Sequence, residues 1–320
     1  MGKIIILLEK KFMKKNTLLT VLLLSFAIFQ PSFAQGVAVP QTEKYMVDPL
    51  VATLEEGKTI AYFDEEGNLL PNENDAYYYR KYLGKNDKNY YLIQDFYMSN
   101  DQKQVNPFYI NNEQGLYSFD NAYAEGKMIW WHENAQKSGE VNFINGKEEG
   151  LLTNWYENGK KESQGKFKNG KLDGIWIYWY DNGQKKSQGK YLNALGEGIW
   201  VYWYENGQKQ AQGKFKKDKL EGVWTRWYDN GQKREMGNYI NDAPDGLWTK
   251  WYENGQTLER VKYINGNPDG RWTTWHSNGK KDAEGVFNNG QQTGLWKFWD
   301  EDGHLTDEEM FENGEVVDPK

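Results

Sequence analysis

The chain has 320 residues and a mass of 37.5 kDa, yet only 38% of its residues are apolar. It contains 15 Trp, 22 Tyr, 14 Phe and 33 Gly, and its mean hydropathy is -0.91. Such a composition argues against one large aliphatic core, and the many aromatic residues argue against bulk disorder.

The net charge of -7 hides a basic N-terminus. Residues 1–34 carry five Lys and one Glu, and subtracting this +4 from -7 leaves -11 for residues 35–320. An acidic body argues against nucleic acid or anionic lipid as the main partner. The absence of Cys excludes disulfides, thiolate metal sites, Cys nucleophiles and a lipoprotein anchor.

The first 34 residues have the pattern of a secretory signal peptide. Lys14 and Lys15 precede an apolar run from Leu18 to Phe29, and Ser32-Phe33-Ala34 resembles a cleavage site. The run is short for a membrane span, which needs ~20 residues. We therefore expect cleavage after Ala34 and export to the periplasm, the outer surface or the medium, with no transmembrane span left. An uncleaved anchor is the alternative, and Met1 and Met13 are both candidate starts.

A period of 24 residues dominates the rest of the chain. One Trp column comprises Trp131, Trp155, Trp179, Trp203, Trp227, Trp251, Trp275 and Trp299. A second column comprises Trp176, Trp200, Trp224, Trp248, Trp272 and Trp296. A Gly opens each unit, at 126, 150, 174, 198, 222, 246, 270 and 294. Repetition at a fixed period indicates an array of identical structural units.

Each unit is predicted to be one β-hairpin. The first strand is rich in Trp, Tyr, Ile, Val and Thr, and Asn-Gly then suits a two-residue type I′ turn. A second Gly-rich turn, such as Asn169-Gly170, leads to the next unit. The Gly density and the lack of a 3.6-residue period exclude helix. The expected fold is therefore all-β, an elongated array of about eight hairpins forming one twisted antiparallel sheet, stabilised by stacking of unit on unit.

A two-residue turn at Asn182-Gly183 fixes an expected pairing of the strands. On one face the expected pairs are Trp176 with Gly189, Tyr178 with Ser187, and Tyr180 with Lys185. On the other face they are Ile175 with Lys190, Ile177 with Gln188, and Trp179 with Lys186. A Trp opposite a Gly fills the space that the Gly leaves.

These motifs resemble the MORN-repeat variant of bacterial envelope and secreted proteins, some of which are described as antitoxin-like. The pattern G-x-W-x-x-W-Y-x-N-G followed by [FY]-x-N-G-x-x-[DE]-G carries the resemblance over about residues 95–315. It implies an extended antiparallel ribbon, a protein-interaction or membrane-proximal role and no catalytic residues. Met128 and Leu152 depart from the pattern by replacing Trp, and Val261 by replacing Gly.

The residues before the array are predicted to form a β-rich cap. Residues 61–68 look like a strand and a turn, and residues 77–82 and 90–97 look like further strands. Tyr97 to Asp101 resembles a degenerate W-Y-E-N-G turn displaced by about ten inserted residues. We divide the chain into a signal peptide (1–34), a cap (35–94), a degenerate repeat (95–125) and the array (126–320). A separate small α+β domain is the alternative for the cap.

Residue types that support chemistry are scattered along the chain. The three His residues lie in different units, whereas a metal site needs convergent ligands. An acidic residue before each opening Gly is expected to accept turn N–H groups, with calcium as the alternative, at Glu125, Glu149, Asp173, Glu197, Glu221, Asp245 and Asp269. We find no catalytic motif and predict no enzyme and no cofactor.

The Trp columns are the sharpest feature of the sequence. Both columns can pack between hairpins, or one can form a partly open aromatic platform. The candidate platform is Trp155, Trp179, Trp203, Trp227, Trp251, Trp275 and Trp299. We predict a non-enzymatic exported scaffold that binds a protein or an envelope component. The alternatives are a carbohydrate- or wall-binding module and an antitoxin-like partner, and the oligomeric state is left open.

Overall fold

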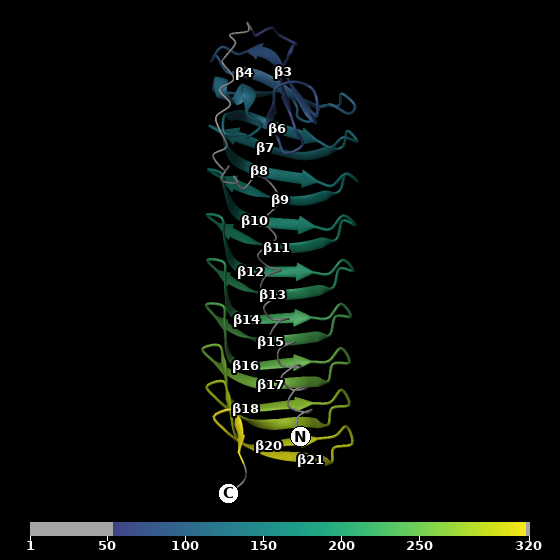
Figure 1. The fold of residues 1–320 in the computed structure, drawn as a ribbon, viewed down its shortest axis with the longest axis vertical. Coiled ribbons are helices and arrows are strands. Elements are labelled where there is room, and N and C mark those ends of the chain that lie inside the picture. The colour runs from purple at the N-terminus through teal and green to yellow at the C-terminus, as the bar shows by residue number, and fades with distance from the viewer. Residues whose placement is uncertain (1–53, 318–320) are drawn as a thin grey trace. The chain divides into compact units, whose positions relative to one another are not determined.

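The computed structural model describes residues 54–317, so the predicted signal peptide (1–34) lies outside the described residues. Apart from one short 3-10 helix, the described chain is all-β, and its strands form one antiparallel sheet of 22 strands. Figure 1 shows the hairpins stacked one after another from β6 to β21. The predicted fold class, an elongated array of 24-residue hairpins, is confirmed.

Five strands and one short helix precede the array. The strands are β1 (Thr59–Phe63), β2 (Leu69–Leu70), β3 (Tyr78–Lys85), β4 (Tyr91–Tyr97) and β5 (Phe108–Ile110), followed by the helix η1 (Glu113–Tyr117). The helix η1 contacts β1, β4 and β5. The strand β1 pairs with both β2 and β3, and β5 pairs with β6, the first strand of the array.

The array strands alternate between the two halves of each hairpin. The first halves are β6 (Ala124–Trp131), β8 (Lys147–Trp155), β10 (Lys171–Trp179), β12 (Leu195–Trp203), β14 (Lys219–Trp227), β16 (Ala243–Trp251), β18 (Asn267–Trp275) and β20 (Gln291–Trp299). The second halves are β7 (Lys137–Ile144), β9 (Lys161–Lys168), β11 (Lys185–Leu192), β13 (Lys209–Lys216), β15 (Lys233–Ile240), β17 (Thr257–Ile264), β19 (Lys281–Asn288) and β21 (Leu305–Glu312). A short strand, β22 (Glu315–Val317), pairs with β21.

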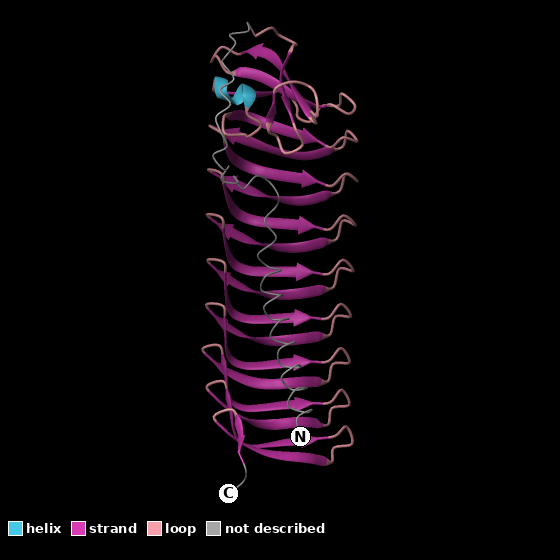
Figure 2. Ribbon diagram, viewed as in Figure 1, coloured by secondary structure: helices cyan, strands magenta, loops and turns pink. Residues whose placement is uncertain are grey.

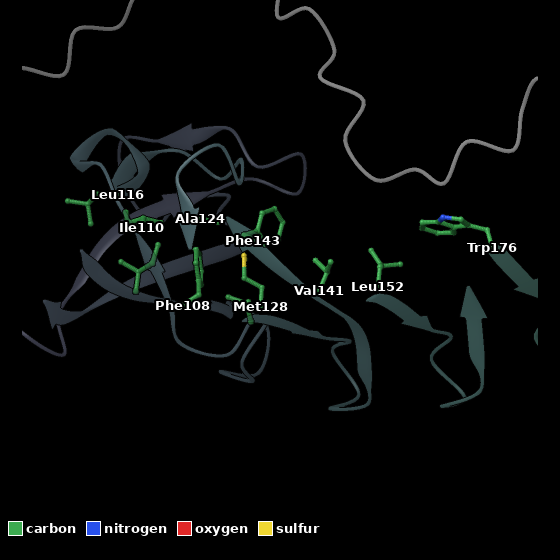
Figure 3. Packing of buried hydrophobic residues seen from close by; sticks show 11 residues of the cluster. Phe108, Ile110, Leu116, Ala124, Met128, Val141, Phe143, Leu152 and Trp176 are labelled. Atoms are coloured by element: carbon green, nitrogen blue, oxygen red, sulfur yellow. The ribbon is translucent and has the colours of Figure 1, made fainter. Parts of the chain in front are cut away.

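A hydrophobic cluster joins the N-terminal strands to the first hairpins. Figure 3 shows Met128, Val141 and Leu152 leading from the cluster around Phe108 to Trp176. Met128 and Leu152, which replace Trp, are 1% and 7% exposed. Aliphatic side chains therefore take the place of Trp where the repeat meets this cluster.

The turn after β4 resembles the repeat turn, as the sequence predicts, but its loop has four residues, 98–101, instead of three. The Tyr97 hydroxyl donates to the carbonyl of Trp131 at 2.8 Å, and the Tyr156 hydroxyl donates to the carbonyl of Trp179 at 2.7 Å. Asn100 also donates to a turn carbonyl of the next hairpin, that of Glu133, as the repeat Asn residues do. The wider spacing of Tyr97 from Trp131 reflects the inserted residues.

The Asn-Gly turn differs from the predicted type I′ turn. Tyr180 and Gln184 close the loop through a Tyr180 N–H to Gln184 carbonyl bond of 2.8 Å, and only Gly183 has a positive φ, 88°. The loop therefore has three residues, Asp181 to Gly183, and its geometry is a type I turn that ends in a left-handed Gly. The same loop recurs along one side of the array (Figure 2).

This extra loop residue makes two of the predicted pairs wrong. Trp179 pairs with Lys185 rather than Lys186, and Tyr180 lies beyond the last strand pair. A bulge at Lys186 then absorbs one residue and restores the expected register. The predicted pairs of Ile175, Trp176, Ile177 and Tyr178 with Lys190, Gly189, Gln188 and Ser187 are therefore confirmed.

Type I′ geometry is found at the turns between units. Asn169 and Gly170 have φ values of 51° and 72°, and Lys168 pairs with Lys171 across them. Gly170 also donates its N–H to the carbonyl of Glu148, near the start of β8 in the preceding hairpin, at 2.9 Å. Both sides of the array are thus connected from hairpin to hairpin by hydrogen bonds.

The opening Gly produces a bulge between neighbouring hairpins. Asp173 pairs with Lys166 and Ile177 with Gln164, so residues 174–176 all lie opposite Gly165. Gly174 has a φ of 76°, a conformation that costs little only for Gly. The bulge displaces the following Trp176 toward the preceding hairpin.

None of the helices in residues 54–317 has the length and apolar character needed to cross a membrane.

Candidate functional site

The second Trp column forms the core of the array on what we call the inner face. Trp176, Trp200, Trp224, Trp248 and Trp296 are between 1% and 5% exposed. Each ring lies over the Gly of the preceding hairpin, because a Cβ on Gly165 would lie 2.1 Å from the Trp176 ring. Trp176 is thus paired with Gly189 in register but packs over Gly165. The expectation that each Trp fills the space at its paired Gly is wrong, since the bulge moves the ring by one hairpin.

This packing also satisfies a backbone group at the bulge. The Trp176 indole N–H donates to the carbonyl of Lys166 at 3.1 Å, and Trp224 does the same to Lys214 at 3.1 Å. The ring of Trp176 makes an edge contact with Phe167, with a centroid distance of 5.3 Å. Each of the four residues Trp176, Trp200, Trp224 and Trp248 therefore holds two hairpins together through apolar contact and one hydrogen bond, whereas the buried Trp296 makes the apolar contact alone.

The first Trp column lies on the opposite face, which we call the outer face. Trp179 follows Ile177 by two residues on β10, so both point to the outer face. The candidate platform residues, Trp155 to Trp299, are all half-buried. Successive rings are two strands apart, which corresponds to a spacing of ~10 Å along the array.

A cation from the preceding hairpin lies over each platform ring. The cation-to-ring distances are 5.0 Å for Lys137 and Trp155, 5.8 Å for Lys161 and Trp179, 5.8 Å for Lys185 and Trp203, 5.8 Å for Lys209 and Trp227, 5.9 Å for Lys233 and Trp251, 5.8 Å for Arg260 and Trp275, and 5.4 Å for Lys281 and Trp299. Where Thr257 replaces the Lys, Arg260 supplies the charge. We call this set the outer Trp row.

Neighbouring side chains hold the cations in place. The Lys185 ammonium donates to the Gln188 amide oxygen at 3.0 Å, and Lys209 donates to Gln212 at the same distance. Beside Trp155, a hollow of about 180 Å³ is lined by Gln136, Lys137 and Gly159. The outer Trp row thus combines aromatic rings, amide groups and ammonium groups, a set that can bind sugars or protein segments.

A ladder of Tyr hydroxyl groups connects the ends of the first strands. The Tyr180 hydroxyl donates to the carbonyl of Trp203 at 2.8 Å, and burial raises the pKa of this hydroxyl from its ordinary value of 10.0. His132 and His276 replace Tyr and contact the carbonyls of Trp155 and Trp299 through Nε2, at 2.8 and 2.9 Å. Both His residues therefore have a structural role in the ladder.

The turn Asn residues form a second ladder. The Asn182 amide donates to the carbonyl of Glu205 in the next turn at 3.0 Å, and its oxygen accepts the N–H of Gln184 at 2.8 Å. This donor explains why the position is Asn in the internal units. In the last repeat turn the position is Asp302.

Five acidic residues of the column accept N–H groups of the turns between units, namely Glu125, Glu149, Glu197, Glu221 and Asp269. Glu149 accepts the N–H of Asn169 at 2.8 Å, and Asp269 accepts that of Asn289 at 3.0 Å. Within residues 54–317, no three His, Cys, Asp or Glu residues are grouped in a way that could hold a metal ion.

Two features of the outer face are missing from the sequence-based candidate site. Trp131 extends the row, with the Lys103 ammonium 3.8 Å from its ring centre. The aliphatic residue after each opening Gly, such as Ile175, is more exposed than any platform Trp, at 54%. The recurring Gly-[LIV]-Trp pattern is the sequence signal for this row of residues.

Comparison with protein families gives a match to the MORN repeat variant over seven consecutive repeats. The matched residues are 148–169, 172–193, 196–217, 220–241, 244–265, 268–289 and 292–313. The hairpin β6–β7 precedes the first matched repeat and has the same pairing of Gly126 with Phe143. A search of curated proteins found no relative. The repeat motif, its seven matches and the hairpin stack together show that the chain belongs to the MORN repeat variant family.

Proposed function

We propose that this repeat protein is a non-enzymatic, exported scaffold that binds one extended partner along its outer Trp row. The observation that carries the proposal is the row itself, in which each half-buried Trp has a cation within 6 Å of its ring. Identical chemistry repeats every ~10 Å, so a partner that runs along the array meets the same contacts many times. The partner is a protein segment or a component of the cell envelope.

A carbohydrate of the cell wall is a second candidate for this partner. Gln188 and Gln212 lie on the outer face beside the Trp row, and their amides can bond with sugar hydroxyls while the rings stack on the sugar. A polysaccharide has the extended, repeating form that the row requires.

The binding experiment compares two triple variants with the wild-type chain. One carries Trp203→Ala, Trp227→Ala and Trp251→Ala, and the control carries Lys171→Ala, Lys216→Ala and Lys219→Ala, which are exposed at the opposite edge of the sheet. The probes are isolated cell walls, chitin and an envelope protein extract. Retention by wild type and control, with a loss of about tenfold or more in the Trp variant, supports the proposal. Equal retention of folded Trp variant and wild type contradicts it.

Export is tested by the intact mass of the protein purified from its host. The proposal predicts a mature N-terminus at Gln35, and a mass that retains residues 1–34 contradicts cleavage. Co-purification of a cytosolic toxin with an uncleaved chain would favour the antitoxin-like alternative.

A further inference from the structure

A straight row of exposed aliphatic side chains runs along the outer face. We call it the aliphatic stripe, and it comprises Leu151 (53% exposed), Ile175 (54%), Ile199 (56%), Val223 (61%), Leu247 (60%) and Leu295 (43%). Each member follows an opening Gly. Exposed aliphatic side chains that recur every ~10 Å, with polar residues between them, indicate an interaction site.

The charges along the stripe are balanced. Ile175 pairs with Lys190, and Lys190 pairs with Glu197 on the next strand. Val223 and Leu295 pair instead with the uncharged Asn238 and Met310. At Arg271 the order is inverted, and its partner Val286 is the exposed aliphatic residue, at 42%. Because both basic and acidic residues border the stripe, its surface has no strong net charge and does not favour a strongly charged partner.

The dimensions of the stripe fit a protein interface. From β8 to β20 it crosses twelve strand spacings, about 60 Å at ~4.8 Å each. Flanking outer-face residues such as Ile177 and Leu192 lie two residues to either side, which gives a width of about 14 Å. The resulting area of about 800 Å² equals what one partner contributes to a stable dimer.

We propose that the aliphatic stripe is the interface with a second copy of this chain, packed stripe against stripe. A second array supplies a stripe with the same ~10 Å repeat, and contact limited to the two stripes leaves the outer Trp row open. The neutral charge pattern is complementary to itself, and homodimers are the commonest oligomers. This interface is separate from the outer Trp row, since Ile175 and Trp179 are four residues, or about 13 Å, apart.

Two triple variants with the same change in charge test the proposal. The stripe variant carries Ile199→Lys, Val223→Lys and Leu247→Lys. The fold tolerates a basic residue at this position of the repeat, because Lys127 and Arg271 occupy it in two other units. The control carries Gln184→Lys, Gln208→Lys and Gln232→Lys in the exposed turns, where Lys160 and Lys280 are the natural equivalents. We expect wild type and control to sediment as dimers, and the stripe variant to associate at least about tenfold more weakly.

A monomeric wild type, or a stripe variant as dimeric as the control, overturns the proposal. A chain that dimerises only after removal of residues 1–53 also overturns the proposal, because residues 1–53 then cover the stripe in the full chain. Because the chain has no Cys, Val223→Cys at the centre of the stripe provides a second readout that requires no loss of stability. We expect a short bis-maleimide to join two Val223→Cys chains but not two Gln208→Cys chains, and equal cross-linking of the two variants contradicts the interface. Neither the sedimentation experiment nor the cross-linking experiment requires the partner of the outer Trp row, so the outcome of each is independent of the proposed function.

Discussion

The junction at Gly213 and the junction at Val261 show two outcomes of the same repeat. At Gly213, Trp224 lies over the Gly, is 1% exposed and donates its indole N–H to the carbonyl of Lys214. At Val261 the side chain occupies this space, and Trp272 is half-buried and donates to the Glu259 carboxylate instead. The core position of Trp thus depends on a residue in another hairpin, eleven positions earlier.

A third junction shows how the same conflict is avoided. Val141 stands in the Gly column, and the residue in the Trp column is Leu152, which is smaller than Trp. Val141 and Leu152 are buried in one cluster. The two columns therefore behave as matched pairs, either Gly with Trp or Val with Leu, and the pair of Val261 with Trp272 is the mismatched one.

The largest effect is expected from replacing the matched Trp. Trp224→Leu should cost about 3 kcal/mol of unfolding free energy, because it leaves a cavity over Gly213 and removes the donor to Lys214. Trp272→Leu should cost less than about 1 kcal/mol, because it recreates the pair of Val with Leu. Denaturant unfolding of both variants measures the difference, and equal costs would contradict the pairing.

The second effect is expected from creating a mismatch. A Cβ on Gly213 would lie 2.0 Å from the Trp224 ring, so Gly213→Val should cost about 2–3 kcal/mol. Adding Trp224→Leu to Gly213→Val should recover part of this loss, giving a coupling free energy of about 1 kcal/mol or more. A double-mutant cycle in denaturant melts measures the coupling, and strict additivity would show that the two columns are independent.

The third effect separates the two Trp columns. Trp227→Ala on the outer face should cost about 1 kcal/mol, because the half-buried ring loses contact with Lys209 and no enclosed cavity forms. Trp224→Ala on the inner face should cost about 3–5 kcal/mol. Paired denaturant melts compare the variants, and a larger loss for Trp227→Ala would mean that the core lies on the outer face.

The smallest effect concerns the Asn ladder. Asn230→Asp removes the amide that donates to the carbonyl of Glu253 at 3.1 Å and should cost about 0.5–1.5 kcal/mol. Asp302→Asn should change the stability by less than about 0.5 kcal/mol, because it lies in the last repeat turn of the array. Thermal unfolding of both variants at one pH measures the two stabilities. An equal loss of stability at both positions would show that the Asn ladder does not stabilise the array.

Sequence alone predicted the period, the hairpin unit and the central strand pairs, because each depends on residues close together in the chain. The loop at Asn182 was predicted wrongly because the Asn has a second role, as a donor to the next turn. The three-residue loop and the bulge at Lys186 then cancelled each other, which is why Trp176 and Gly189 pair as expected.

The parts that sequence could not predict arise between hairpins. The bulge at Gly174 moves Trp176 over Gly165 rather than over its paired Gly189, and no pairing rule within one hairpin contains this shift. For the same reason the exposure of Ile175 was missed, since it lies at the bulge. The sequence identified the Trp residues of the outer Trp row. It did not identify the cation over each ring, because that cation comes from the preceding hairpin.

The central claim is that each 24-residue unit is one hairpin stabilised by its neighbours, and two deletions test it most directly. Removing Gly198 to Glu221 takes out one whole hairpin and joins Glu197 to Gly222, which preserves the register. Removing the 12 residues from Gly198 to Lys209 takes out one strand and breaks the alternation. Circular dichroism and denaturant melts should show a folded, shorter array after the first deletion and loss of cooperative folding after the second. Equal damage from the two deletions would contradict the claim.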